Sequence, residues 1–142
     1  MSLDVLLAPD VFVNASVALG SPPDQVVQRV LGKHPKECAV TKWILARIEA
    51  MLLAVPTFKD EAVEPQLRRI VELTRPVATE GDHGPDDWAG ALVEAAKAAG
   101  VERVVTDHPD LLEQERVEGV EFVSTEAWLL EQALPPPPPP AS

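Results

Sequence analysis

The sequence contains a single cysteine, Cys38. One cysteine excludes an internal disulfide framework and any zinc site built from several cysteines. Aromatic residues are also scarce, at 4% of the 142 residues. A core must therefore be built from valine, leucine, isoleucine and alanine. The lack of disulfides is typical of a reducing compartment, and we predict a cytoplasmic protein.

Positive charge is in short supply as well. Twelve Lys and Arg residues stand against 23 Asp and Glu, which gives a formal net charge of −11. Such a surface repels phosphate backbones and argues against electrostatic binding of nucleic acid over a broad area. A small local basic patch is still compatible with this net charge. The first ten residues lack the basic region and long apolar core of a signal peptide. No apolar run is long enough to cross a bilayer, so we predict no membrane association.

Segments with the pattern of a strand and segments with the pattern of a helix alternate along the sequence. Short apolar runs predict strands at residues 3–8, 38–40, 77–78, 103–105 and 120–123. Amphipathic stretches with capping or breaking residues at their ends predict helices at residues 21–31, 41–55, 60–73, 86–99 and 124–134. Residues 11–16 fit either a helix or a loop. Strands separated by helices favour a mostly parallel sheet covered on both faces, so we predict a three-layer α/β/α sandwich.

The chain is long enough for one compact domain and too short for two. We assign residues 1–134 to this domain. The remaining residues, 135–142, are six prolines followed by Ala-Ser, and they cannot join a sheet or a helix. We predict that this tail is a disordered, extended polyproline II arm. Such an arm is also a ligand type for aromatic grooves.

Polar residues gather just after two of the predicted strands. Asp10 follows the first strand, and the cluster at residues 106–110, with the sequence TDHPD, follows strand 103–105. In open α/β sheets, ligands and chemistry lie at the carboxyl ends of the strands. We therefore expect a site here. The alternatives are that Asp10 caps a helix and that the cluster is only a turn.

The order and spacing of these segments resemble the PIN domain family, in particular its prokaryotic toxin-like branch. The resemblance covers residues 5–128 and implies the PIN fold. It is carried by five segments in order, namely VLLAPDVFVNASV, GSPPDQVVQRVL, TKWILARIEAML, EAAKAAGVERVVTDHPDLL and GVEFVSTEAWL. In the family, these correspond to the first strand with its aspartate, the first helix, the helix that starts with Ser or Thr, the helix–strand–turn unit, and the last strand and helix.

The resemblance implies a metal-dependent endoribonuclease. Members of the family gather carboxylates at the carboxyl edge of the sheet, where they hold Mg²⁺ or Mn²⁺, and many are toxins paired with an antitoxin. Hard cations prefer oxygen ligands, and a bound ion supplies hydroxide from water and polarises the phosphodiester. In this sequence the implied catalytic and metal-binding residues are Asp10, Asp86 and Asp107, with Thr106, Asp87, His108, Asp110 and Glu49 as additional candidates.

The sequence departs from the family pattern at several positions. Phe12 replaces an asparagine, His108 occupies the metal-binding position of the Thr-x-Asp turn, and Arg47 stands where the second acid is expected. Asp86 lies one turn before the position of the third acid and shares its helix face. A guanidinium near Asp10 would pair with the acids and oppose cation binding, so we predict that Arg47 neutralises a degenerate site.

Two functions follow from these observations and stay open at the level of sequence. The first is a Mg²⁺- or Mn²⁺-dependent endoribonuclease that acts on RNA. The second is a non-catalytic PIN-like module without a metal, which binds an antitoxin-like protein, another protein partner or its own copy as a homodimer.

Overall fold

The computed structural model describes residues 5–133 of the 142. Short strands and longer helices alternate along this part of the chain. The strands are β1 (Val5–Leu7), β2 (Ala39–Val40), β3 (Arg75–Pro76), β4 (Arg103–Val105), β5 (Arg116–Val117) and β6 (Val120–Val123). The helices are α1 (Pro9–Val17), α2 (Pro22–Lys33), α3 (Lys42–Ala54), the 3-10 helix η1 (Asp60–Ala62), α4 (Val63–Leu73), α5 (Trp88–Ala99), α6 (Pro109–Gln114) and α7 (Thr125–Ala133).

The main sheet has four strands in the order β1-β4-β6-β5. β1, β4 and β6 are parallel, and their last residues, Leu7, Val105 and Val123, lie in register with one another. β5 closes one edge as the antiparallel partner of β6. A second, two-stranded parallel sheet pairs β2 with β3. The carboxyl ends of three parallel strands therefore meet at one edge of the main sheet.

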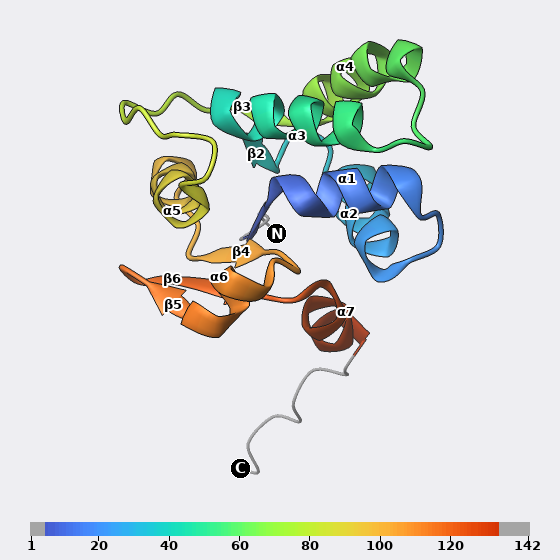
Figure 1. The fold of residues 1–142 in the computed structure, drawn as a ribbon. Coiled ribbons are helices and arrows are strands. Elements are labelled where there is room, and N and C mark those ends of the chain that lie inside the picture. Colours follow the sequence, from blue (N-terminus) through green and yellow to red (C-terminus); the bar gives the residue numbers. More distant parts are fainter. Residues whose placement is uncertain (1–4, 134–142) are drawn as a thin grey trace.

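Helices cover the strands on both sides, with α5 on one side and α1 and α2 on the other (Figure 1). This arrangement confirms the predicted α/β fold with a mostly parallel central sheet flanked by helices. The core is mainly aliphatic, as the composition requires, and joins strand residues such as Leu6 and Val104 to helix residues such as Ile48 and Leu92. Cys38 lies inside it, and burial raises the pKa of its thiol to about 12.

Most predicted elements are present, with some differences at their ends. Residues 11–16 are helical and belong to α1, which starts at Pro9. α2 continues through Gly32 to Lys33, so the predicted end of this helix at residue 31 is two residues too early. The predicted strand at residues 77–78 lies instead at Arg75–Pro76, because these two residues pair with β2. The predicted polyproline tail lies outside the described residues.

Two elements were not predicted at all. α6 begins inside the TDHPD cluster, at Pro109, and β5 follows it and forms a tight hairpin with β6. Within residues 5–133, no helix is long and apolar enough to span a membrane.

Candidate functional site

Four polar residues meet at the carboxyl edge of the main sheet. Asp10 lies in the first turn of α1, just after β1, and Thr106 and Asp107 directly follow β4. Thr125 starts α7, just after β6. The parallel register of β1, β4 and β6 brings these four residues together although they are far apart in sequence. We call this group the acid tie.

The Asp10 carboxylate accepts a hydrogen bond on each of its oxygens. The Thr106 hydroxyl donates to Oδ1 at 2.8 Å, and the Asp107 backbone N–H donates to Oδ2 at 2.8 Å. Asp10 is only 7% exposed. Burial raises the pKa of this carboxyl above its usual value, and the two hydrogen bonds offset only part of that effect. The buried carboxylate thus links the end of β1 to the end of β4.

The Asp107 carboxylate is engaged in the same way. Its Oδ1 accepts from the backbone N–H of Thr125 at 2.9 Å, and its Oδ2 accepts from the Thr125 hydroxyl at 2.7 Å. An acid at this place also suits the positive end of the α7 dipole. Asp107 therefore fastens the start of α7 to the end of β4. Together the two acids link three consecutive strand ends.

An aromatic group lies next to the acid tie. Trp88 contacts His108 with ring centroids 4.9 Å apart and meets Trp43 edge to face at 5.7 Å. His108 also begins α6, where its Nδ1 accepts from the Asp110 N–H at 3.3 Å. The position at which the sequence resemblance implies a metal-binding acid is thus occupied by a helix-capping imidazole packed on a tryptophan.

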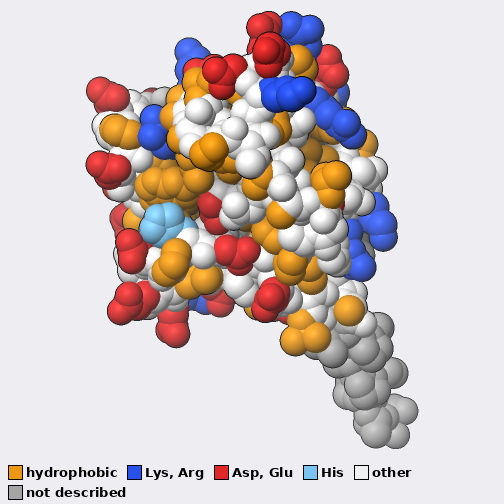
Figure 2. Space-filling view, turned by 45° about the vertical axis from the view of Figure 1, so that its right-hand side comes forward, with side chains coloured by type: hydrophobic (Ala, Val, Ile, Leu, Met, Phe, Trp, Pro, Cys, Tyr) orange, Lys and Arg blue, Asp and Glu red, His pale blue; other side chains and the backbone are white. Residues whose placement is uncertain are grey.

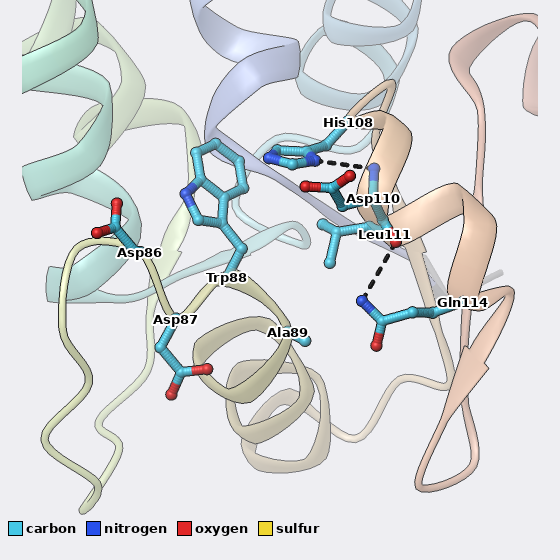
Figure 3. Close-up of a pocket in the computed structure, with 8 residues that line it drawn as sticks. All are labelled: Asp86, Asp87, Trp88, Ala89, His108, Asp110, Leu111 and Gln114. Carbon is cyan, nitrogen blue, oxygen red and sulfur yellow. Dashed lines mark hydrogen bonds between the residues drawn. The ribbon is translucent and has the colours of Figure 1, made fainter.

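A pocket of about 370 Å³ opens beside Trp88 (Figure 3). It is lined by Asp86, Asp87, Trp88, Ala89, His108, Asp110, Leu111 and Gln114. In Figure 3, Asp86 lies on one side of Trp88, and His108 and Asp110 lie on the other. The Asp87 side chain is engaged at the start of α5, where it accepts from the Gly90 N–H at 3.1 Å and caps the helix. The pocket therefore carries acids, but they are dispersed around an indole ring.

Of the predicted catalytic residues, the structure brings Asp10, Thr106 and Asp107 together. Asp86 is exposed at the pocket rim. Glu49 is an exposed residue of α3. Its neighbour Arg47 is partly exposed on the same helix.

The predicted pairing of Arg47 with the acids is not formed within residues 5–133, where no carboxylate lies within ion-pair distance of its guanidinium. Instead, the Asp10 and Asp107 carboxylates accept hydrogen bonds from hydroxyl and N–H donors. These donors belong to Thr106, Asp107 and Thr125.

The ligand set for a divalent ion is incomplete in the described part of the chain. Mg²⁺ and Mn²⁺ need several oxygen ligands that converge on one point. No three His, Cys, Asp or Glu side chains among residues 5–133 are grouped so that they could hold a metal ion. The donors on Asp10 and Asp107 also direct both carboxylates toward protein atoms. The residues present do not fit the metal that the family resemblance implies.

A second ionic cluster, which the sequence analysis did not single out as a site, lies on the loop before α5. His83 Nδ1 lies 2.8 Å from Asp87 Oδ2, and His83 Nε2 lies 3.5 Å from Glu94 Oε1. Glu94 also accepts from the Gly81 N–H at 2.9 Å. A Cβ on Gly81 would stand 2.4 Å from the Glu94 carboxylate, so a larger residue here would displace the Glu94 side chain from its present position. We call this cluster the His83 clasp, because it fastens the loop to α5.

The His83 clasp predicts a pH-dependent stability. The hydrogen bond to Asp87, aided by the charge of Glu94, raises the pKa of His83 above its ordinary value of 6.5. A raised pKa in the folded state stabilises the fold below pH 6.5, and this contribution is lost as pH rises through the folded-state pKa. We expect denaturant unfolding to show a wild-type advantage over His83→Gln of less than about 1 kcal/mol at pH 6, which disappears by pH 9. An advantage that is equal at both pH values would contradict the ionic role of His83.

Comparison with known proteins gives a likeness in fold and no match in sequence. No protein-family model and no curated protein matches the sequence. Among solved structures, the fold is similar to a chain in the crystal structure of VapBC2 from Rickettsia felis bound to a DNA fragment from its promoter. The TM-score is 0.59, the sequence identity is 11%, and the match covers 84% of this chain and 97% of that chain. At this identity the likeness is one of fold.

Proposed function

We propose that this protein is a PIN-like domain that acts by binding a protein partner, and that its acidic site holds the fold together rather than cleaving RNA. The likeness in fold to a chain of the VapBC2 complex supports the PIN-like relationship. The observation that carries the proposal is the acid tie. Both oxygens of Asp10 and both oxygens of Asp107 accept hydrogen bonds from the protein itself.

A nuclease site of this kind would need acids that are free to share a cation. Repulsion between like charges is what makes such a cluster costly without its ion. In the acid tie, neutral N–H and O–H donors compensate the charge of Asp10 and Asp107. The third implied acid, Asp86, lies on the far side of the Trp88 ring from His108 (Figure 3). The arrangement favours a structural use of the acids.

The surface supports a binding role. Figure 2 shows one face on which hydrophobic side chains and a histidine lie among acidic side chains, while most of the visible Lys and Arg side chains lie toward the top and right. Trp43 and Trp88 are only half-buried, and tryptophan is enriched where proteins meet. A protein partner, either an antitoxin-like chain or a second copy of this chain, fits these features better than a phosphate backbone does.

A metal-dependent endoribonuclease is the second candidate. It is favoured by the placement of Asp10 and Asp107 at the carboxyl ends of β1 and β4, and by Asp86 and Asp110 around the neighbouring pocket. In this case, Mg²⁺ or Mn²⁺ would bind lone pairs of Asp10 and Asp107 that the present hydrogen bonds leave free, since each carboxylate oxygen accepts one hydrogen bond and has two lone pairs.

A thermal melt with and without millimolar Mn²⁺ separates the two functions. An ion that binds only the folded state raises stability by RT ln(1 + [L]/Kd), so a functional site gives a clear upward shift. We expect Mn²⁺ to shift the wild-type protein and Asp10→Asn equally, by less than about 1 °C, and we expect no RNA cleavage above the Asp10→Asn background. A shift of several degrees that is lost in Asp10→Asn, together with cleavage, would establish the nuclease instead.

A further inference from the structure

A groove of about 680 Å³ runs between the start of α3 and the segment that follows β3. Its volume lies within the range of sites that bind small ligands and short peptides. Its walls are mainly apolar and include Trp43, Leu45, Ala46, Pro76, Val77 and Ala78. We call it the Trp43 groove. It is distinct from the acid tie and from the pocket beside Trp88, although the Trp43 and Trp88 rings touch at the boundary.

Four residues that line the Trp43 groove have backbone N–H groups with no acceptor in the described part of the chain. Val77 is the last residue of its segment to bond to β2, through its N–H and the Val40 carbonyl. The N–H groups of Ala78 and Thr79, and those of Lys42 and Trp43 in the first turn of α3, donate to no acceptor among residues 5–133. An occupant that supplies carbonyl acceptors would satisfy them.

The sequence contains a segment with matching chemistry. Residues 135–140 are six consecutive prolines, each of which has a carbonyl acceptor and no N–H donor. Proline runs favour the polyproline II conformation, so they pay little conformational entropy on binding. Aromatic-lined grooves are the usual receptors for such segments. Residues 134–142 also carry no charged side chain, which suits a groove whose walls are mainly apolar.

We propose that the Trp43 groove binds the proline run at residues 135–140 of a second copy of this chain. α7, which leads into the tail, ends at Ala133 on the opposite side of the molecule from α3 and β3 (Figure 1). A second copy can present its tail to the groove without crossing the domain. Reciprocal exchange of two tails between two grooves gives a closed dimer with two-fold symmetry. The inference deepens the proposed function by identifying the protein partner as the chain itself.

Two full-length variants separate the tail from the groove. In the tail variant, residues 135–140 are all changed to serine, which leaves the groove intact. In the groove variant, Ala46→Glu puts a charged side chain into the groove from an exposed position of α3, which leaves the tail intact. Ala50→Glu is the matched control, because Ala50 is exposed on the same helix and does not line the groove.

Sedimentation equilibrium is the first measurement. We expect the wild type and Ala50→Glu to associate with increasing concentration, and the tail variant and groove variant to stay monomeric when alone. A mixture of the two variants should recover association, because one copy supplies a tail and the other a groove. A synthetic peptide of residues 133–142 should bind the tail variant, with a change in tryptophan fluorescence, at least tenfold more tightly than it binds Ala46→Glu carrying the same tail changes.

The opposite results would overturn the inference. A mixture of variants that stays monomeric would exclude tail exchange, as would equal binding of a control peptide with serine in place of the six prolines. If the wild type is monomeric and its own tail still prevents the added peptide from binding, the tail lies in the groove of the same chain. This result would overturn the assignment to a second copy. None of these measurements depends on RNA or metal, so failure of tail exchange is distinguishable from failure of the non-catalytic proposal.

Discussion

Asp10→Ala is expected to lower the free energy of unfolding by about 2 kcal/mol, or roughly 5–8 °C in Tm for a domain of this size. The substitution removes an acceptor from the buried Thr106 hydroxyl and from the Asp107 N–H, and each loses a bond of 2.8 Å. Relief of the cost of burying the Asp10 charge offsets part of this loss. Denaturant unfolding monitored by circular dichroism measures the difference.

Asp86→Ala is the matched control. Asp86 is exposed, and its side chain makes no hydrogen bond or ion pair within the described residues. Its removal should change the free energy of unfolding by less than about 0.5 kcal/mol. If Asp10→Ala proved as neutral as Asp86→Ala, or stabilised the protein, Asp10 would be a strained functional acid rather than a structural one.

The sequence predicts the central elements well, because their signals are local. The strands at Arg103–Val105 and Val120–Val123 have the predicted bounds. Thr41 and Ser124 cap α3 and α7 as their positions indicated, with hydroxyl oxygens that accept N–H groups of Ile44 and Ala127. Each of these features depends on neighbours within four residues, which a single sequence displays directly.

The hairpin of β5 and β6 was missed because its local signals are weak. β5 has two residues, and the chain turns through Glu115 and Glu118 at φ of 59° and 49°. Glutamate rarely adopts such angles, so neither residue indicates a turn in the sequence. Only Gly119, at φ of 86°, has the residue type that a left-handed position favours. The pairing with β6 overrides the local preferences.

The candidate site was predicted in outline and not in its bonding. Asp10 and the residues after β4 could be placed at one edge, because parallel strands end together. Thr125 could not, since its contact with Asp107 joins residues 18 apart and carries no motif. Arg47 was predicted to neutralise the acids because of its position in the family pattern. In the structure, neutral donors of Thr106 and Thr125 bond to the acids instead. The roles of Asp10, Asp86 and Asp107 in catalysis stay predictions.

Asp107→Ala gives the sharpest distinction between the two functions, because they predict opposite signs. If Asp10 and Asp107 were metal ligands held close without their ion, removal of one would relieve repulsion and stabilise the protein. In the acid tie, Asp107 accepts at 2.9 Å and 2.7 Å from Thr125, so its removal frees the start of α7. We expect a loss of about 2 kcal/mol in the free energy of unfolding.

A double-mutant cycle extends this test to the pair. The backbone N–H of Asp107 donates to Asp10 while its side chain accepts from Thr125, so the two acids act in series along one chain of bonds. Once Asp10→Ala has loosened the turn after β4, the hydrogen bonds between Asp107 and Thr125 contribute less stability, so Asp107→Ala removes less. The double variant should therefore be about 1 kcal/mol more stable than the sum of the single effects predicts. If the two changes in the free energy of unfolding are strictly additive, the two carboxylates stabilise the sheet edge separately and the acid tie is not one unit. Thr125→Val is an independent check on the contact with α7.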